Sequence, residues 1–176
     1  MADLLSLDLV EKRLMTDQMV LTVGYDVENL KDGRTYGGPV EIDRYGRSIP
    51  KEAHGSINLE HRTSSSKTIV EAVARLYDRI VNPKLLVRRM YVVANRVVDE
   101  TTAQSKPEQF DLFTDYKALE EQRAKEQADA ERERKAQEAL LAIRQKLGKN
   151  AILKGMNLED GATARDRNRQ IGGHKA

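Results

Sequence analysis

The sequence predicts an α+β fold: a small antiparallel sheet with two helices on one face, followed by a linker, a long charged helix and a basic tail. Three observations predict it. Residues 1–99 alternate strand-like and helix-like apolar patterns, residues 116–147 are rich in helix-forming side chains, and residues 148–176 are glycine-containing and basic. Charged residues make up 33% of the chain and hydrophobic ones 39%, so only part of the chain can form a packed core.

The first predicted elements are a helix, a strand and a long excursion. Six apolar residues between Leu4 and Leu14 fall mostly on one helical face, and this helix begins with only Asp3 as a possible capping side chain. Residues 19–27 are β-branched and apolar, which predicts a strand. Residues 28–53 contain repeated glycine and proline and predict a long irregular loop or hairpin excursion.

Residues 54–98 supply the second half of the predicted unit. Residues 54–63 alternate apolar and polar side chains, as in a half-buried strand, and the serines at 64–66 can cap a helix. That helix carries an amphipathic stripe from Ile69 to Ile80 and ends near Pro83. Residues 86–98 then predict a strand that contains three arginines.

The charge distribution divides the chain further. The net charge is +1 over residues 1–99, −3 over 100–115, −1 over 116–143 and +5 over 144–176. We therefore expect a folded domain at 1–99, an acidic linker at 100–115, a long helix at 116–147 and a basic, flexible tail at 148–176.

The long helix and the tail carry few apolar side chains. The helix has one apolar stripe, expected to be a packing seam, and Gly148 is expected to end it; the stripe consists of Ala136, Leu140, Ile143 and Leu147. The tail has enough apolar residues for one docking turn, namely Ile152, Leu153, Met156 and Leu158. Its arginines at 165, 167 and 169 are either solvated or an added contact to nucleic acid.

The linker carries a concentrated apolar signal. The chain has two phenylalanines, Phe110 and Phe113, and both lie in the linker on either side of Leu112. One interpretation is that these side chains pack back onto the small domain. The other is a short linear motif, in which Gln109 makes polar contacts while Leu112 and Phe113 fill an apolar pocket on a partner.

Residues 109–113 read Gln-Phe-Asp-Leu-Phe, which resembles the bacterial sliding-clamp-binding pentapeptide, usually Gln-Leu-x-Leu-Phe. Phe110 replaces the usual leucine, an apolar exchange that we expect to be tolerated. The chain as a whole resembles the C-terminal part of Y-family (UmuC/DinB-type) translesion DNA polymerases. The resemblance is carried by the pentapeptide and by residues 16–26, 54–60, 85–89, 94–95 and 148–157.

The resemblance implies that residues 1–99 correspond to most of the little finger domain, which grips duplex DNA beside the lesion. It also implies that the first little-finger strand, the palm, the fingers, the thumb and the catalytic carboxylates are missing. We therefore expect the C-terminal portion of a longer protein, with no catalytic activity, no catalytic residues and no cofactor.

DNA-backbone contacts need cations, hydroxyls and amides on one surface, and such contacts are not sequence-specific. The candidates are Ser56, Asn58, Arg62, Thr63, Ser64, Arg88, Arg89, Asn95 and Arg96. Strand alternation predicts that Arg88 and Arg96 share one face and Arg89 takes the other. The alternative is that the arginines form ordinary surface ion pairs with Asp26, Glu28 or Glu60.

The remaining patterns argue against an enzyme. The three histidines lack a metal-ligand spacing, so we expect no metal site. With no cysteine, disulfides and thiolate chemistry are excluded, and the chain shows neither a secretory signal nor a membrane-spanning apolar run. We expect a cytoplasmic location and no membrane partner.

Two functions remain from these patterns. The first is the DNA-binding and clamp-tethering portion of a translesion polymerase, with primer–template duplex, the sliding clamp and an in-frame polymerase core as partners. The alternative is a freestanding regulatory or scaffold protein that competes for the clamp or oligomerises through its long helix.

Overall fold

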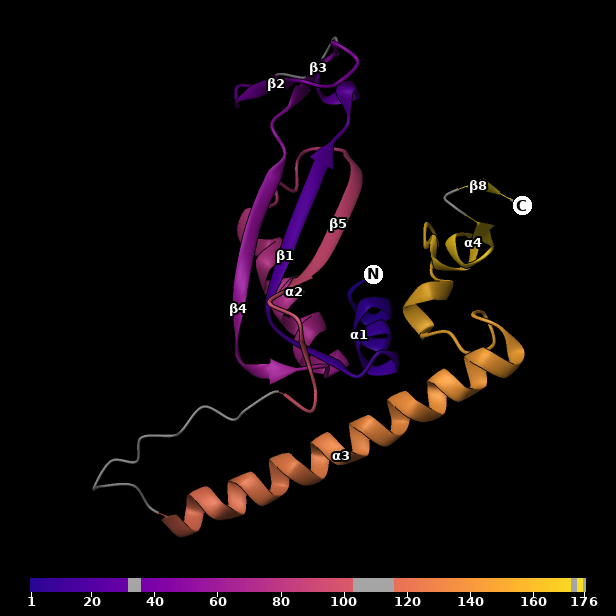
Figure 1. The fold of residues 1–176 in the computed structure, drawn as a ribbon. Helices are drawn as coiled ribbons and strands as arrows, with labels where there is room; N and C mark the ends of the chain where they lie inside the picture. The colour runs from indigo at the N-terminus through magenta and orange to yellow at the C-terminus, as the bar shows by residue number, and fades with distance from the viewer. Residues whose placement is uncertain (32–35, 103–115, 172–173, 176) are drawn as a thin grey trace. The chain divides into compact units, whose positions relative to one another are not determined.

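The computed structural model describes residues 1–31, 36–102, 116–171 and 174–175. It contains two compact units, Met1–Gln109 and Phe110–Ala176 (Figure 1). The first unit holds a small antiparallel sheet and two helices, so the predicted α+β class is confirmed. The second unit holds the long helix and the described part of the tail.

The central strand of the sheet is β1 (Leu14–Tyr25), which pairs antiparallel with β4 (Ala53–Thr63) on one side and β5 (Val87–Asn95) on the other. A short β6 (Val98–Asp99) pairs with the first residues of β1. The predicted strand at 19–27 therefore begins too late, because Leu14 and Met15 already pair with β6. The predicted strand at 86–98 is split between β5 and β6.

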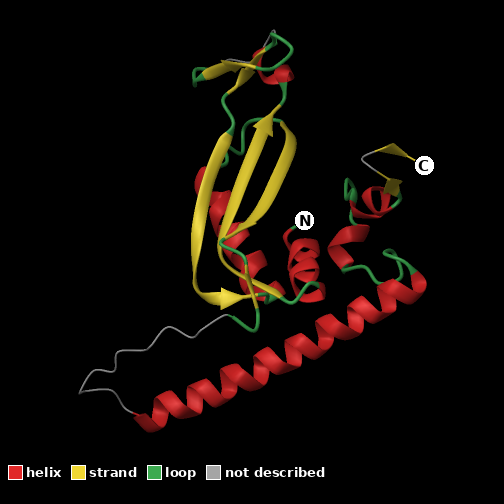
Figure 2. Ribbon diagram, in the orientation of Figure 1, coloured by secondary structure: helices red, strands yellow, loops and turns green. Residues whose placement is uncertain are grey.

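Both helices of the first unit pack on one face of this sheet, as predicted (Figure 2). Helix α1 (Ala2–Glu11) has no side-chain cap, in line with the sequence, and it ends before Leu14, which belongs to β1. Helix α2 (Ser66–Ile80) has the predicted serine cap, because the side chain of Ser65 accepts a hydrogen bond from the Thr68 backbone N–H at 3.2 Å.

The core lies between the sheet and these helices. Met19, Leu21 and Val23 of β1 alternate toward the helices and are at most 1% exposed. They belong to the same apolar clusters as Ile69 and Leu76 of α2, which are fully buried. The alternation leaves the intervening residues of β1 on the opposite face of the sheet.

Helix α2 approaches β4 closely at Gly55. A Cβ atom at this position would lie 3.1 Å from Ile80 Cγ2 and 3.2 Å from Leu76 Cδ1. These distances are tighter than ordinary van der Waals contact, so the missing side chain allows the helix to sit against the strand.

The predicted excursion at 28–53 contains a short helix and a hairpin. The elements are η1 (Val27–Leu30), β2 (Val40–Ile42) and β3 (Ser48–Pro50). Asn29 fixes the base of the excursion: its side-chain Nδ2 donates to the Leu86 carbonyl at 3.0 Å, and its Oδ1 accepts from the Leu86 N–H at 2.8 Å. The hairpin part of the prediction is confirmed.

In the second unit, α3 (Tyr116–Leu147) has the range that composition predicts, and Gly148 ends it with a φ of +91°. Short elements follow, namely η2 (Gly155–Leu158), α4 (Ala164–Asn168), β7 (Gln170–Ile171) and β8 (His174–Lys175). The side chain of Asn168 donates to Asn150 Oδ1 at 2.7 Å and so connects α4 to the end of α3.

The apolar stripe of α3 is not a continuous buried seam. Ala136 is exposed, and Leu147 is 74% exposed. Met156 and Leu158 of η2 are also exposed, at 66% and 64%. The predicted docking turn therefore forms as a turn, but these two side chains point to solvent. Over the described ranges, no helix has both the length and the apolar character needed to cross a membrane.

Candidate nucleic-acid interface

The face of the sheet that neither α1 nor α2 covers is called here the open face. It carries Gln18, Val20, Thr22 and Gly24 from β1, His54, Ser56, Asn58 and Glu60 from β4, and Arg89, Tyr91, Val93 and Asn95 from β5. The strand register arranges most of these side chains in rows that cross all three strands. Within the paired strands, the predicted DNA contacts Ser56, Asn58, Arg89 and Asn95 lie on this face, and Arg62 and Arg96 reach it from the strand ends.

One row consists of three amides. Gln18 lies opposite both Asn58 and Asn95 in the register. Its Nε2 donates to Asn58 Oδ1 at 2.9 Å, and its Oε1 accepts from Asn95 Nδ2 at 3.2 Å. Because Asn58 Oδ1 is occupied, the Asn58 side chain presents its amide N–H groups as donors.

Arg96 extends this row. Its backbone φ is +51°, in the left-handed region that few non-glycine residues adopt, and β5 ends just before it. The guanidinium Nη2 donates to Asn58 Oδ1 at 2.9 Å. The expectation that Arg96 shares a face with Arg88 is therefore wrong, because the turn in the backbone brings Arg96 over to the open face.

Near the end of β5, the Asp17 carboxylate forms ion pairs with Arg62 and Arg96. Asp17 Oδ2 lies 3.6 Å from Arg62 Nε, and Asp17 Oδ1 lies 3.7 Å from Arg96 Nη1. Asp17 occupies the irregular step in the β1–β4 register between Thr16 and Gln18. Its oxygen Oδ1 is buried without a hydrogen bond, so the ion pair with Arg96 is the interaction that compensates it.

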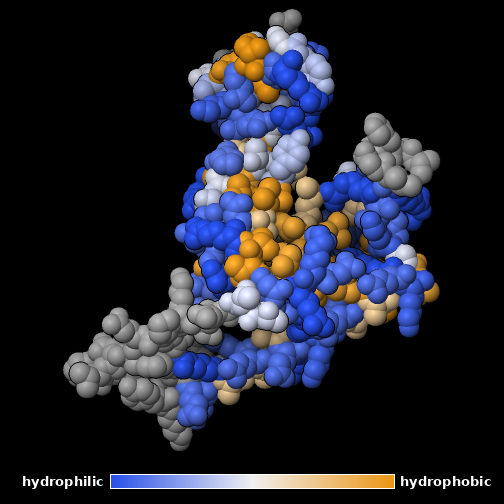
Figure 3. Space-filling view, viewed as in Figure 1, coloured by the Kyte–Doolittle hydropathy of each residue, from blue (hydrophilic) through white to orange (hydrophobic). Residues whose placement is uncertain are grey.

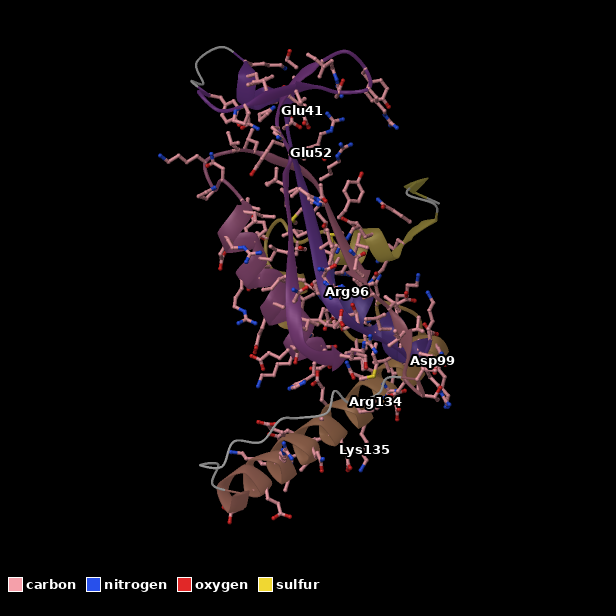
Figure 4. All side chains as sticks on the ribbon, turned by 60° about the vertical axis from the view of Figure 1, so that its left-hand side comes forward. Glu41, Glu52, Arg96, Asp99, Arg134 and Lys135 are labelled. Carbon is pink, nitrogen blue, oxygen red and sulfur yellow. The ribbon has the colours of Figure 1, made fainter. Side chains whose placement is uncertain are left out.

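The opposite end of the open face carries Arg89. This side chain lies across Gly24, where a Cβ atom would come within 2.9 Å of Arg89 Cγ. The guanidinium donates to Glu52, and this hydrogen bond raises the pKa of Arg89 above its ordinary value. The same guanidinium lies 5.7 Å from the ring centroid of Tyr91. In Figure 4, Arg96 lies between Glu52, near the hairpin, and Asp99 of β6.

The middle of the open face mixes apolar and polar side chains. Ser56 and Val93 lie on either side of Val20, and Val93 is 47% exposed. In the next row, Thr22 Oγ1 and His54 Nδ1 share a hydrogen bond of 2.9 Å. Figure 3 shows apolar surface between polar surfaces over these strands. Such a face offers shallow apolar contact bordered by hydrogen-bond donors.

The charge of the open face is nearly balanced. The cations Arg62, Arg89 and Arg96 are accompanied by three carboxylates, Asp17, Glu52 and Glu60. The predicted alternative is that the arginines form ordinary surface ion pairs with Asp26, Glu28 or Glu60. Three of the arginines do form surface ion pairs, but with other partners: Arg89 pairs with Glu52, and Arg62 and Arg96 pair with Asp17. These partly exposed pairs contribute little to stability, on the order of 0–1 kcal/mol each.

Three predicted contacts lie elsewhere. Thr63 accepts a hydrogen bond from the Ser65 N–H at 3.0 Å, and Ser64 is only 7% exposed at the turn into α2. Arg88 is exposed at the register step of β5 that pairs Val87 with Tyr25. The clamp-binding candidates Gln109, Phe110, Leu112 and Phe113 lie outside the described residues.

The same unit contains a cavity of about 560 Å³ beside the excursion. Its described lining comprises Asn29, Tyr36, Gly37, Gly38, Pro39, Asn82, Lys84 and Leu85. Lys84 is the one charged side chain in this described lining. No group of three or more His, Asp or Glu side chains that could hold a metal ion occurs among the residues that the structure describes.

Comparison with protein-family models, curated proteins and solved structures finds no match. The interpretation of the open face therefore depends on its own geometry. Site residues that were not predicted from the sequence include Asp17, Gln18, Thr22 and Tyr91. Two of them could have been found, because the apolar alternation of Met19, Leu21 and Val23 places Gln18 and Thr22 on the face opposite the core. No comparable signal marked Asp17, because its partners come from distant parts of the chain.

Proposed function

We propose that this chain is the non-catalytic DNA-binding and sliding-clamp-tethering portion of a translesion DNA polymerase. The open face would hold primer–template duplex through its phosphate backbone, and Gln109–Phe113 would bind the sliding clamp. The resemblance described above suggests the family, and the chemistry of the open face supports DNA as the ligand.

The observation that carries the proposal is the row formed by Asn58, Gln18, Asn95 and Arg96. Hydrogen bonds within the row hold an amide donor and a guanidinium on one surface formed by three strands. Amide N–H groups and guanidinium groups are the donors that phosphate oxygens accept from, and their side chains are already ordered here. Less conformational entropy is lost on binding when such groups are fixed in advance.

The near-neutral charge of the open face favours weak binding to duplex DNA. Phosphate binding gains most of its free energy from releasing counterions, and each carboxylate beside an arginine reduces that gain. A linked clamp-binding motif compensates by raising the effective concentration of the domain at the DNA. In this proposal, weak DNA binding by the open face therefore depends on clamp binding by Gln109–Phe113.

The test is fluorescence anisotropy with the full chain and two labelled duplexes of unrelated sequence, measured over a range of salt concentrations. We expect similar affinity for both sequences and weaker binding as salt increases. The variant Arg96→Ala should weaken binding and reduce the salt slope by about one phosphate contact.

Arg75→Ala is the matched control, because Arg75 is an exposed arginine of α2, on the helix that covers the opposite side of the sheet. Arg75→Ala should leave both the affinity for the duplexes and the salt slope unchanged. Absence of binding at low salt, or equal losses in Arg75→Ala and Arg96→Ala, would contradict the proposal.

A further inference from the structure

Residues 43–47 form the turn that joins β2 to β3, and hydrogen bonds to Asp43 hold this turn together. Asp43 Oδ1 accepts from the backbone N–H groups of Tyr45 and Arg47 at 2.8 and 2.9 Å. Asp43 Oδ2 accepts from Arg47 Nε at 2.9 Å and Nη2 at 2.6 Å. Gly46 has a φ of +76°, which suits glycine, and its N–H donates to the Asp43 carbonyl at 2.9 Å. The turn therefore holds its side chains in fixed positions.

This turn presents one aromatic ring with two guanidinium groups. The guanidinium carbons of Arg44 and Arg47 lie 4.8 and 5.2 Å from the centroid of the Tyr45 ring, which is 66% exposed. Arg44 Nη2 also donates to Tyr45 Oη at 2.7 Å. Arg47 is neutralised by Asp43, whereas Arg44 has no carboxylate partner among the described residues. The turn thus combines an exposed aromatic side chain, flanked by two guanidinium groups, with one positive charge that has no carboxylate partner among the described residues.

The hairpin that carries the turn is anchored at its base. Ile49 of β3 is 8% exposed, and the Lys51 N–H donates to the Pro39 carbonyl at 2.9 Å. The hairpin lies beyond the end of the sheet at which β1 finishes (Figure 1), and Glu41 of β2 accepts from the Glu52 N–H at 3.4 Å, with both residues labelled near each other in Figure 4. The Tyr45 ring is therefore held away from the core, in a position from which it can meet a ligand that extends past the sheet.

We propose that the turn at 43–47 binds an unpaired nucleotide, with Tyr45 stacking on the base and Arg44 contacting the adjacent phosphate. An exposed aromatic ring beside a cation is the combination by which proteins bind single-stranded nucleic acid without sequence preference. The inference rests on the proposed function, because it gives the DNA held on the open face a single-stranded continuation. An anionic membrane is disfavoured, since three cations of residues 40–52 (Arg44, Arg47, Lys51) are balanced by Glu41, Asp43 and Glu52.

The experiment compares three labelled probes with the full chain by anisotropy: a blunt duplex, the same duplex with a single-stranded overhang, and a single-stranded oligonucleotide. Wild type should bind the overhang probe more tightly than the blunt duplex. Tyr45→Ala should weaken binding of the overhang and single-stranded probes by about tenfold and leave the blunt duplex unchanged. Tyr45→Phe should retain wild-type affinity, because a phenyl ring also stacks.

Ile42→Ala is the matched control, because Ile42 is 67% exposed on the same hairpin but has no ring. The inference is overturned if Tyr45→Ala binds all three probes as wild type does, or if Ile42→Ala weakens binding equally. It is also overturned if the Tyr45-dependent ligand is instead a vesicle of phosphatidylserine and phosphatidylcholine. Failure of the proposed function has another signature, namely no blunt-duplex binding while the single-stranded probe still binds in a Tyr45-dependent manner.

Discussion

Arg96 Nη2 and Asn58 Oδ1 lie 2.9 Å apart, although 38 positions separate the two residues in the sequence. The contact joins the end of β5 to β4 across the central strand, where Gln18 donates to the same oxygen atom. The position of the Arg96 guanidinium therefore depends on the pairing of all three strands. A loss of that pairing would release the guanidinium as well as the amides.

Asn58→Ala and Arg96→Ala should weaken DNA binding in different ways. Removing Arg96 deletes a cation, so the salt slope should fall by about one unit. Removing Asn58 deletes a neutral donor and frees Arg96 to move, so affinity should fall while the salt slope stays at the wild-type value. Salt titrations of both variants distinguish these outcomes; equal slopes in the two variants would show that Arg96 makes no phosphate contact.

Thr16→Val should destabilise the first unit. Thr16 is fully buried, and its hydroxyl accepts from the Gln18 N–H at 3.2 Å and donates to the Asn95 carbonyl. Valine has a similar shape but leaves both backbone groups unsatisfied, which costs about 1–3 kcal/mol. Urea unfolding followed by circular dichroism measures the change. Thr68→Val, at an exposed position of α2, should behave as wild type.

Gly55→Ala should also destabilise the first unit, because the new methyl group would meet Ile80 and Leu76 at 3.1 and 3.2 Å. Overpacking of this kind costs about 1–3 kcal/mol. Gly37→Ala serves as the control, since its Cβ would meet nothing within 4 Å. If the two variants unfold at the same urea concentration, α2 moves away from β4 more easily than its packing indicates.

The turn at 43–47 should weaken only in strong acid. Hydrogen bonds from Arg47 and Tyr45 lower the pKa of Asp43 from its ordinary value of 3.8 to about 2. Since the folded-state pKa is the lower one, the stabilising effect is complete above pH 3.8 and is lost as the pH falls through about 2. Carboxyl-detected NMR titration measures this midpoint, and Arg47→Ala should move it back toward the ordinary value. An unchanged midpoint in that variant would contradict the assigned hydrogen bonds.

Leu112→Ala/Phe113→Ala should abolish capture of the full chain by an immobilised bacterial sliding clamp. The two apolar side chains are the proposed anchors, and truncating anchors removes most of the energy of a small interface. Phe110→Leu restores the usual pentapeptide pattern and should be captured at least as well as wild type. Equal capture of all three proteins would remove the motif from the proposed function.

The sequence predicted the secondary structure well where local pattern decides it. The serine cap at Ser65, the stripe of α2 and the bounds of α3 all follow from short-range residue preferences. The start of β1 was misplaced because Leu14 fits a helical stripe as well as it fits a strand. Only its pairing with Asp99, far away in the sequence, decides between the two.

The candidate site was harder to predict because it depends on register. Alternation separates the two faces of each strand, but it does not say which residues of neighbouring strands lie opposite each other. The row of amides and the Asp17 ion pairs arise from that long-range pairing. The end of β5 at Asn95 could not be predicted from nearby residues either, since arginine rarely adopts the left-handed backbone conformation seen at Arg96.

The balance of arginines and carboxylates on the open face has a kinetic consequence. A surface without a strong net potential does not attract a polyanion from a distance, so electrostatic steering adds little to the rate of encounter. Under the proposed function, the frequency with which the open face meets DNA would therefore be set by a partner bound to the same chain rather than by diffusion of the domain alone.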